Sequence, residues 1–257
     1  MTMKQTYARA LVTGASSGFG EHFARQLSAR GTALVLVARR GDRLEKLAAE
    51  LGTPIEILPA DLTDAAGLAL VEDRLRDAAN PVDLLVNNAG VGTTGEFAKQ
   101  PVEGETNKVA LNAMALMRLC HAALPRMTEA RHGGILNVSS LAGTTPAPRA
   151  ATYGATKAFV TSLSESLHRE NRRQGVHVTA LLPGPAPTEL TEAGFENLLP
   201  RLFWQSPEAI VARGLAAVAA GKPVCIPSRV LSVATVTGAR MPRSFQYLVG
   251  ERLFGSK

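Results

Sequence analysis

The stretch RALVTGASSGFG, residues 9–20, joins a short apolar run to a turn with three glycines, and a helical pattern follows at once over residues 18–30. Glycine lets the backbone turn sharply and approach a ligand without an intervening Cβ. The first turn of a helix adds unpaired N–H groups and the positive end of the helix dipole. This order of strand, turn and helix predicts a cradle for a pyrophosphate group, with a purely structural turn as the alternative. The residues expected to form the cradle are Gly14, Ser16, Ser17, Gly18, Phe19 and Gly20.

Short apolar runs alternate with amphipathic, helix-like stretches through most of the chain. Because the runs lack an in/out alternation and are separated by helices, we expect a parallel sheet that is buried on both faces. No repeat or linker divides the sequence, so we predict a single α/β domain over residues 1–257: a Rossmann-type, doubly wound parallel sheet with helices on both faces. The runs lie at 7–12, 33–38, 54–59, 82–86, 134–138, 176–182 and, more weakly, 223–227, and the helical stretches at 18–30, 41–51, 64–79, 106–131 and 152–173.

Two later segments do not fit the sheet pattern. Residues 185–204 combine prolines with leucines and aromatic residues, and we interpret them as a lid over a substrate site. Residues 228–257 are interpreted as a C-terminal helical extension that is broken at Gly238 and Pro242. Packing on the domain or a subunit contact is the preferred role of this extension, and contact with a membrane surface, which we do not expect, is the alternative.

Composition narrows the possible partners. The 257 residues carry a net charge of +6, but the basic residues are spread along the chain, and only three tyrosines and one tryptophan could stack on bases. We therefore expect no nucleic-acid partner. The longest apolar runs, such as residues 33–38, are far shorter than the ~20 residues that a membrane span needs.

Cysteine usage and the start of the chain predict the compartment. Cys120 and Cys225 belong to no CxxC pair or Cys/His cluster, so we expect two buried, reduced thiols and no metal site. The start MTMKQTYARALVTG runs straight into a strand and lacks the apolar core of a signal peptide. Both observations predict a cytoplasmic protein.

The end of the second apolar run predicts which dinucleotide binds. About 20 residues after the glycines, a site for NAD usually holds an acidic residue that binds the ribose 2′-hydroxyl. Here Ala38 is followed by Arg39 and Arg40. An arginine fork matches the geometry of a phosphate, and no carboxylate is present to repel one. The sequence therefore favours NADP, with Arg39 on the 2′-phosphate and Arg40 close to it; two solvated arginines at a helix start are the alternative.

A tyrosine and a lysine occur four residues apart at the head of the long helical stretch 152–173. Tyr153 and Lys157 share one face of a helix at this spacing, so the ammonium can lie beside the phenol. A fixed ammonium, together with the positive ring of an oxidised nicotinamide, would lower the phenol pKa from its usual value near 10. The preceding strand delivers Ser139 and Ser140 to the same edge of the sheet.

Taken together, these motifs resemble those of the short-chain dehydrogenase/reductase family over roughly residues 7–190. The TGxxxGxG motif corresponds to residues 13–20, the NNAG motif to 87–90 and the YxxxK motif to 153–157. The PGxVxT motif corresponds to 183–188, with Ala186 in place of the usual Val or Ile. Asn87 and Asn88 could instead satisfy backbone groups at a strand end. Beyond the cradle and the two arginines, the resemblance implies cofactor contacts from Asp61, Leu62, Asn88, Ala89, Gly90, Tyr153, Lys157, Pro183, Gly184 and Thr188.

The resemblance also implies a catalytic set of Asn112, Ser140, Tyr153 and Lys157. Ser140 is chosen because the family interval between serine and tyrosine is 13 residues, which leaves Ser139 with a structural role. In the family, the tyrosine gives its proton to a carbonyl oxygen or removes it from an alcohol, and the serine hydrogen-bonds the same oxygen. The lysine lowers the tyrosine pKa and binds the nicotinamide ribose, and Asn112 would hold a water.

These expectations combine into an NADP-dependent oxidoreductase that interconverts a carbonyl and an alcohol. The alternatives are a dinucleotide-sensing regulatory protein with little catalysis and a structural scaffold. The stretches 106–131 and 152–173 resemble helices that pair subunits in the family, so we expect a homodimer or homotetramer. An apolar ketone, aldehyde or secondary alcohol is the expected substrate, because the lid carries Leu190, Phe195, Leu198, Leu199, Phe203 and Trp204.

Overall fold

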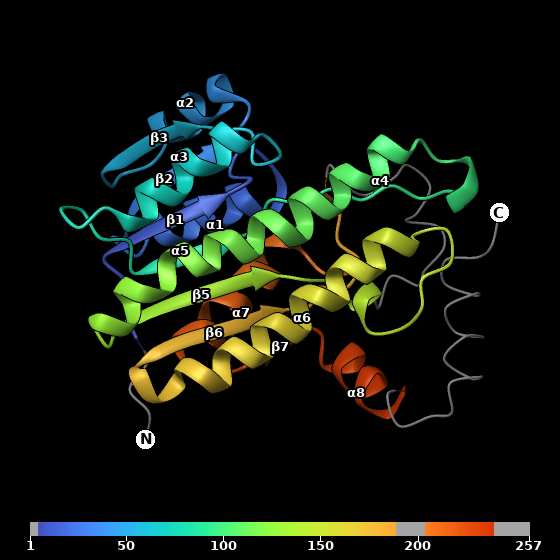
Figure 1. Cartoon of the computed structure of the whole chain (residues 1–257). Coiled ribbons are helices and arrows are strands. Elements are labelled where there is room, and N and C mark those ends of the chain that lie inside the picture. The colour runs from blue at the N-terminus through green and yellow to red at the C-terminus, as the bar shows by residue number, and fades with distance from the viewer. Residues whose placement is uncertain (1–4, 189–203, 239–257) are drawn as a thin grey trace.

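The centre of the molecule is a sheet of seven parallel strands in the order β3-β2-β1-β4-β5-β6-β7. The computed structural model describes residues 5–188 and 204–238 (Figure 1). The order reverses between β1 and β4, and ligands bind at this switch point in doubly wound sheets. The predicted Rossmann-type α/β fold is therefore confirmed. The strands are β1 (Arg9–Thr13), β2 (Ala33–Ala38), β3 (Ile55–Pro59), β4 (Leu84–Asn87), β5 (Gly133–Val138), β6 (Val176–Leu181) and β7 (Val224–Cys225).

Helices cover both faces of the sheet, and each face has its own apolar core. On one face, Phe23 and Leu215 are buried against the strands by α1 (Gly18–Ser28), α2 (Gly41–Ala49) and α7 (Pro207–Ala219). On the other face, which is in front in Figure 1, Leu119 and Val160 are buried by α3 (Ala65–Arg76), α5 (Leu116–Glu129) and α6 (Ala151–Asn171). Burial on both sides explains why the strands are apolar throughout rather than alternating.

The predicted single helix over residues 106–131 is wrong in one important detail. The structure has α4 (Val102–Val109), a π-helical segment η2 (Ala110–Ala115) and then α5. A π turn holds an extra residue, so it rotates the side chains that follow relative to a regular helix, and such turns occur mostly at functional sites. Asn112 lies in this segment and is buried.

Several further elements complete the described residues. Helix α7 begins at a Ser206 N-cap whose hydroxyl accepts from the Ala209 N–H, with Pro207 in the first turn, and the sequence patterns did not predict it. The expected lid residues 189–203 and the extension residues 239–257 lie outside the described part of the chain. The short helical elements are η1 (Phe97–Lys99), η3 (Leu141–Gly143), η4 (Arg172–Gln174) and α8 (Arg229–Gly238).

The two cysteines differ in their surroundings. Cys120 is buried, and burial raises its pKa to about 12, whereas Cys225 is only partly buried; both are free thiols. The expectation that both are buried is therefore wrong for Cys225, because β7 is a two-residue strand at the edge of the sheet. Among the described helices, none is long and apolar enough to cross a membrane.

Two helix glycines provide a matched test of the packing. A Cβ on Gly67, in the first turn of α3, would collide with the Asp61 carbonyl oxygen and lie 3.0 Å from the Asp61 nitrogen. A Cβ on Gly104, in α4, would meet no atom within 4 Å. We expect Gly67→Ala to lower the free energy of unfolding by about 1–3 kcal/mol and Gly104→Ala to raise it by about 0.5–1 kcal/mol. Urea unfolding measures both, and a shift of both in the same direction would contradict the close approach of α3 to Asp61.

Candidate active site

The glycine-rich turn between β1 and α1 has the backbone shape that a close approach requires. Gly14 and Gly18 have φ angles of +64° and +54°, a region that favours glycine. A Cβ on Gly14 would lie 2.9 Å from the Asn88 amide nitrogen and 3.0 Å from the Cα of Ala89. A Cβ on Gly20 would overlap the Gly14 carbonyl oxygen. Because Gly14 and Gly20 have no Cβ, the turn can pack this closely against its neighbours.

Asn88 ties the end of β4 to the end of β1. Its side-chain amide donates to the Thr13 carbonyl at 2.9 Å, and its backbone N–H donates to the Thr13 hydroxyl at 3.0 Å. The Ala89 N–H donates to the same hydroxyl at 3.0 Å. Asn88 thus does satisfy backbone groups, and by doing so it holds the loop with Ala89 and Gly90 against the cradle.

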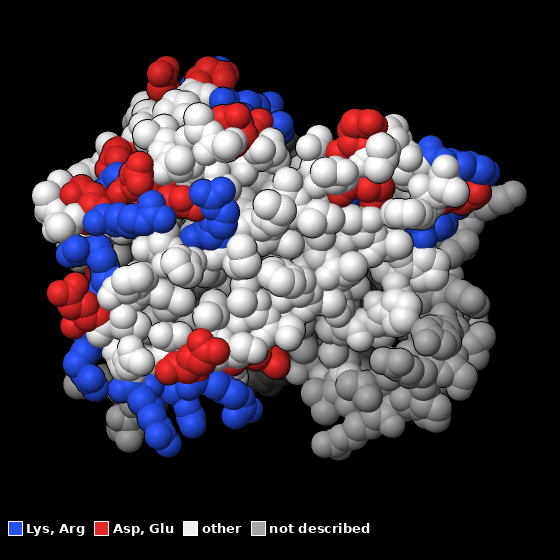
Figure 2. All heavy atoms as spheres, in the orientation of Figure 1, with Lys and Arg blue, Asp and Glu red and all other residues white. Residues whose placement is uncertain are grey.

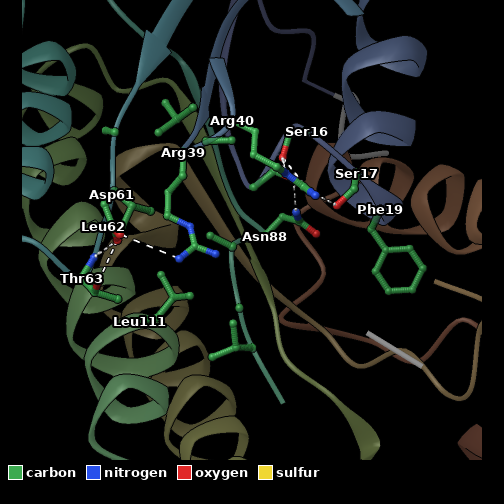
Figure 3. A pocket seen from close by; sticks show the side chains of 18 of the residues that line it. Ser16, Ser17, Phe19, Arg39, Arg40, Asp61, Leu62, Thr63, Asn88 and Leu111 are labelled. Carbon is green, nitrogen blue, oxygen red and sulfur yellow. Dashed lines mark hydrogen bonds and ion pairs between the residues drawn. The ribbon is translucent and has the colours of Figure 1, made fainter. Parts of the chain in front are cut away.

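Both arginines after β2 face the same cleft (Figure 3). The Arg40 guanidinium donates to the Ser16 hydroxyl at 3.1 Å and to the Ser17 hydroxyl at 3.0 Å. The Arg39 side chain is 71% exposed, and its guanidinium lies 3.9 Å from the Asp61 carboxylate. Arg40 is therefore the arginine that contacts the cradle, while the assignment of Arg39 to a 2′-phosphate stays a prediction.

Asp61 marks the far wall of this cleft. Its carboxylate accepts from the Thr63 hydroxyl at 2.7 Å and from the Thr63 N–H at 2.9 Å. These bonds, with the charge of Arg39, hold the Asp61 pKa below its usual value. The carboxylate is thus fixed in place and ionised at neutral pH.

The cleft runs along the carboxyl ends of β1, β2, β3 and β4. Most of the predicted cofactor-binding residues line it. The exceptions are Gly20, which is buried in α1, Tyr153 and Lys157 in α6, and Pro183 and Gly184 after β6. The sequence patterns did not single out Thr63, Val91 or Leu111, although each adjoins or nearly adjoins a predicted residue. The predicted residues that line the cleft are Gly14, Ser16, Ser17, Gly18, Phe19, Arg39, Arg40, Asp61, Leu62, Asn88, Ala89, Gly90 and Thr188, joined by Val37, Ala38, Ala60, Thr63, Val91 and Leu111.

The cleft fits an anionic dinucleotide. Ser17 is the N-cap residue of α1, but its side chain accepts no hydrogen bond from the first turn of the helix. The Ser17 hydroxyl therefore leaves the first backbone N–H groups of α1 available to a ligand. A helix start of this kind, next to glycines without Cβ atoms and a cationic Arg40, is suited to phosphate oxygens. Among the described residues, no group of His, Cys, Asp and Glu could hold a metal ion.

Tyr153 and Lys157 meet at the head of α6. The Lys157 ammonium nitrogen lies 5.7 Å from the centre of the Tyr153 ring. The Ser140 hydroxyl is near enough to the phenol to act on its pKa as a hydrogen-bond donor. The ammonium donates to the Val138 carbonyl oxygen at 2.8 Å. The spacing of four residues on one helix face therefore brings the two side chains together.

Without a cofactor, burial is the largest cause of the pKa shifts of both Tyr153 and Lys157. Burial raises the pKa of Tyr153, while the hydrogen bond from Ser140 opposes this shift. Burial also lowers the pKa of Lys157 to about 8. The expected low phenol pKa is thus not a property of the chain by itself. At neutral pH the phenol keeps its proton and the lysine is still mostly charged.

Asn112 braces the loop that backs this pair. Its side-chain amide accepts from the Val91 N–H at 2.9 Å and donates to the Val91 carbonyl at 2.8 Å. On either side of Val91, a Cβ on Gly90 would lie 3.4 Å from the Lys157 nitrogen, and a Cβ on Gly92 would lie 3.1 Å from the Tyr153 ring. The clasped loop is therefore a close-fitting wall behind both side chains.

The two serines after β5 have different surroundings. Ser140 is partly exposed, and its hydroxyl accepts from the Ala142 N–H at 3.1 Å besides its bond with Tyr153. Ser139 is 2% exposed, and its hydroxyl is turned into the interface with α6. Of these two serines, Ser140 is the one that acts on the pKa of the phenol.

Comparison with known proteins agrees with this geometry. A family model described as short chain dehydrogenase matches residues 8–198, well over half of the chain. The chain belongs to the short-chain dehydrogenase/reductase family. Within this family it is similar to the NADP-dependent 3-hydroxy acid dehydrogenase of Shigella flexneri, with 37% identity over 175 residues, which are 68% of this chain and 71% of that protein.

Two solved structures extend the likeness to nearly the whole chain. The enzyme from Sphingobium yanoikuyae, in complex with NADPH, is 38% identical with a TM-score of 0.80, and the match covers 90% of this chain and 93% of that one. The bulky-bulky ketone specific alcohol dehydrogenase of Comamonas testosteroni is 34% identical with a TM-score of 0.79 and coverage of 95% and 94%.

A backbone hydrogen bond joins the two ends of the predicted substrate lid. The Gln205 N–H donates to the Pro185 carbonyl at 3.2 Å, so the two ends of the segment between them meet. Thr188 lies at the cleft, next to Gly18. Of the apolar lid residues, Trp204 is described and partly buried, and Leu190, Phe195, Leu198, Leu199 and Phe203 lie outside the described residues.

The buried lysine predicts a dependence of stability on pH. The folded-state pKa of Lys157, about 8, lies below its ordinary value of 10.5, so burial of the charge destabilises the fold fully below about pH 8. As the pH rises from about 8 to 10.5, the folded protein releases this proton and the penalty disappears. We expect Lys157→Met to raise the free energy of unfolding by about 3 kcal/mol at pH 6.5, with a gain that shrinks toward pH 10.

Urea unfolding without added cofactor, at several pH values, measures this effect. Lys46→Met is the matched control, because Lys46 is exposed on α2 and its replacement removes no buried charge. A Lys157→Met gain that is constant across the pH range would contradict a buried, charged lysine.

Proposed function

We propose that the protein is an NADP-dependent oxidoreductase that interconverts a carbonyl and an alcohol, with Tyr153 as the acid and base. One observation carries the proposal: the Lys157 ammonium lies 5.7 Å from the centre of the Tyr153 ring, and Ser140 acts on the pKa of the same phenol. This group stands at the carboxyl edge of the sheet, where the dinucleotide cleft also opens. The relatives named above are oxidoreductases, which supports the class of reaction.

The raised pKa of Tyr153 suits the reducing direction. Because the phenol stays protonated at neutral pH, it can donate its proton to a carbonyl oxygen as that oxygen gains negative charge. The Ser140 hydroxyl stabilises the same oxygen by a hydrogen bond. The Lys157 ammonium stabilises the phenolate that the transfer leaves behind, and it does so only below about pH 8, where it is charged.

The cofactor assignment rests on the cleft. When bound, the nicotinamide dinucleotide supplies or accepts the hydride. The glycine turn and the start of α1 would hold its pyrophosphate, and Arg40 with Arg39 would hold a 2′-phosphate. The NADPH complex of the Sphingobium yanoikuyae enzyme supports this choice. We propose further that Asn112 serves mainly to hold the loop at Val91.

An apolar substrate is the proposed class. The predicted lid carries the partly buried Trp204, and the related alcohol dehydrogenase of Comamonas testosteroni is named for bulky ketones. An apolar lining favours a ketone, aldehyde or secondary alcohol over a charged compound. The cytoplasm stays the proposed location.

We also propose a homo-oligomer that pairs through α5 and α6. Met114, Met117 and Phe159 are 53%, 42% and 42% exposed on this side of the molecule. Figure 2 shows few charged side chains in the middle of the same face, over α5 and α6. Exposed large apolar side chains that gather on one face are typical of a protein interface.

Removal of one hydroxyl tests the reaction. We expect Tyr153→Phe to lower the turnover of NADPH with aliphatic, aromatic and steroid-like carbonyls by at least about 100-fold, because the proton donor is lost. Tyr7→Phe is the matched control: it removes a buried hydroxyl near Gly134, at the opposite edge of the sheet. Absorbance at the NADPH band measures both. Tight NADPH binding without turnover on any carbonyl would instead favour a dinucleotide-sensing protein.

Cofactor choice is tested by binding affinities. We expect Arg40→Ala to weaken NADPH binding by about 10- to 100-fold, because a charge-assisted bond to the 2′-phosphate is lost, while NADH binding changes little. Arg39→Ala should have a smaller effect of the same kind. Lys46→Ala, which removes a positive charge from α2 outside the cleft, is the control. Equal losses for NADPH and NADH in Arg40→Ala would contradict the assignment.

A further inference from the structure

Ser139 has a buried hydroxyl that the proposed chemistry does not use. The hydroxyl donates to the backbone carbonyl of Lys157 at 2.8 Å and lies 2.8 Å from the hydroxyl of Thr161. The Thr161 hydroxyl also reaches the Lys157 carbonyl, at 3.0 Å. Ser139 follows β5 directly, so the bond joins the end of the strand to α6 at the lysine itself.

The residue just before Ser139 holds the other end of the same lysine. The Val138 carbonyl oxygen accepts from the Lys157 ammonium at 2.8 Å. Two consecutive residues thus bind the two ends of Lys157. Ser139 binds its backbone carbonyl, and Val138 binds its side-chain ammonium. We propose that Ser139 is a positioning residue, which together with Val138 clamps Lys157 and so fixes the place of its ammonium beside Tyr153.

A clamp has a physical purpose at this position. The lysine side chain is a flexible four-carbon stem, and ordering it costs up to about 2 kcal/mol of rotamer entropy. The Val138 carbonyl fixes only the tip of that stem. The tip is well placed relative to Tyr153 only if the backbone of α6 is also fixed at Lys157, and this is the contact that Ser139 makes.

The packing on the other side of the lysine backbone is equally close. A Cβ on Gly143 would lie 2.6 Å from the Lys157 carbonyl carbon and 2.6 Å from the Ala158 nitrogen. The backbone of η3 therefore lies directly against the peptide bond between Lys157 and Ala158. Held between η3 and Ser139, this peptide has little room to shift, and water has little access to it.

A second link between β5 and α6 provides a control. Asn137 donates to the Ser164 hydroxyl at 2.9 Å, and that hydroxyl donates to the Val160 carbonyl at 2.6 Å. Ser164 is fully buried, as Ser139 nearly is, and it joins the same strand to the same helix. In the described part of the chain, Ser164 forms no hydrogen bond with Lys157. A serine-to-alanine change at either position removes one buried hydroxyl from the same interface.

The consequence for catalysis rests on the proposed function. The attraction between the ammonium and a phenolate falls as their separation grows, and a misplacement of about 1 Å can cost up to about 100-fold in rate. Ser139 does not line the cleft, and its hydroxyl contacts the Lys157 carbonyl and the Thr161 hydroxyl, so its effect on catalysis is expected to pass through Lys157. Loss of its hydroxyl should therefore change the titration of Lys157 and the catalytic rate together.

The titration of Lys157 can be followed without any turnover. In protein labelled with ¹³C- and ¹⁵N-lysine, the Lys157 side-chain resonance is the one that Lys157→Met removes, and it should titrate near pH 8 in the unsubstituted protein. We expect Ser139→Ala to move this titration toward the ordinary lysine value, because the released ammonium can reach better-hydrated positions. Ser139→Cys, which keeps a weaker donor, should lie between the two, and Ser164→Ala should leave the titration unchanged.

Kinetics on the same variants provide the second measurement. We expect kcat for carbonyl reduction to fall by about threefold or more in Ser139→Ala, with the carbonyl KM within about twofold, and to stay near the unsubstituted value in Ser164→Ala. An unchanged Lys157 titration in Ser139→Ala, or an equal shift in Ser164→Ala, would overturn the clamp. A protein that reduces no carbonyl but still shows the shift in Ser139→Ala alone would retain the clamp and lose the proposed function.

Discussion

A positive charge inside the fold is the constraint on which the rest of the site depends. The Lys157 ammonium is buried, and burial lowers its pKa to about 8, so at neutral pH the protein retains a charge that its interior disfavours. The two apolar cores on either side of the sheet must offset this cost. The Val138 carbonyl, the Ser139 hydroxyl and the close backbone of Gly143 then confine the lysine to one position.

The sheet places the proposed cofactor cleft and the proposed proton-transfer group behind different strands. The arginines and the glycine turn follow β2 and β1, whereas Ser140 and the Tyr153 pair follow β5. Asn112 stands between the two regions, on a π turn whose extra residue lets its amide reach both groups of the Val91 backbone. Because parallel strands end at one edge, residues more than 100 positions apart in the chain meet without long loops.

Periodicity and spacing predicted the parts of this architecture that repeat or carry a fixed pattern. The strands, the cradle at residues 13–20 and the tyrosine–lysine pair all follow from local sequence. The π turn at Asn112 was missed because its residues keep a helical composition, and only the path of the backbone reveals the extra residue. The Val138 carbonyl was missed because a backbone acceptor leaves no trace in residue type. That Arg40, more than Arg39, faces the cradle depends on how α2 begins.

The bond between the Gln205 N–H and the Pro185 carbonyl has an evolutionary consequence. It closes the segment between them at its base, so strand β6 on one side and helix α7 on the other keep their relation whatever sequence lies between. Loop closure costs grow only slowly with length. Insertions, deletions and exchanges between these two residues should therefore be tolerated over evolution without a change in how β6 and α7 pack on the sheet.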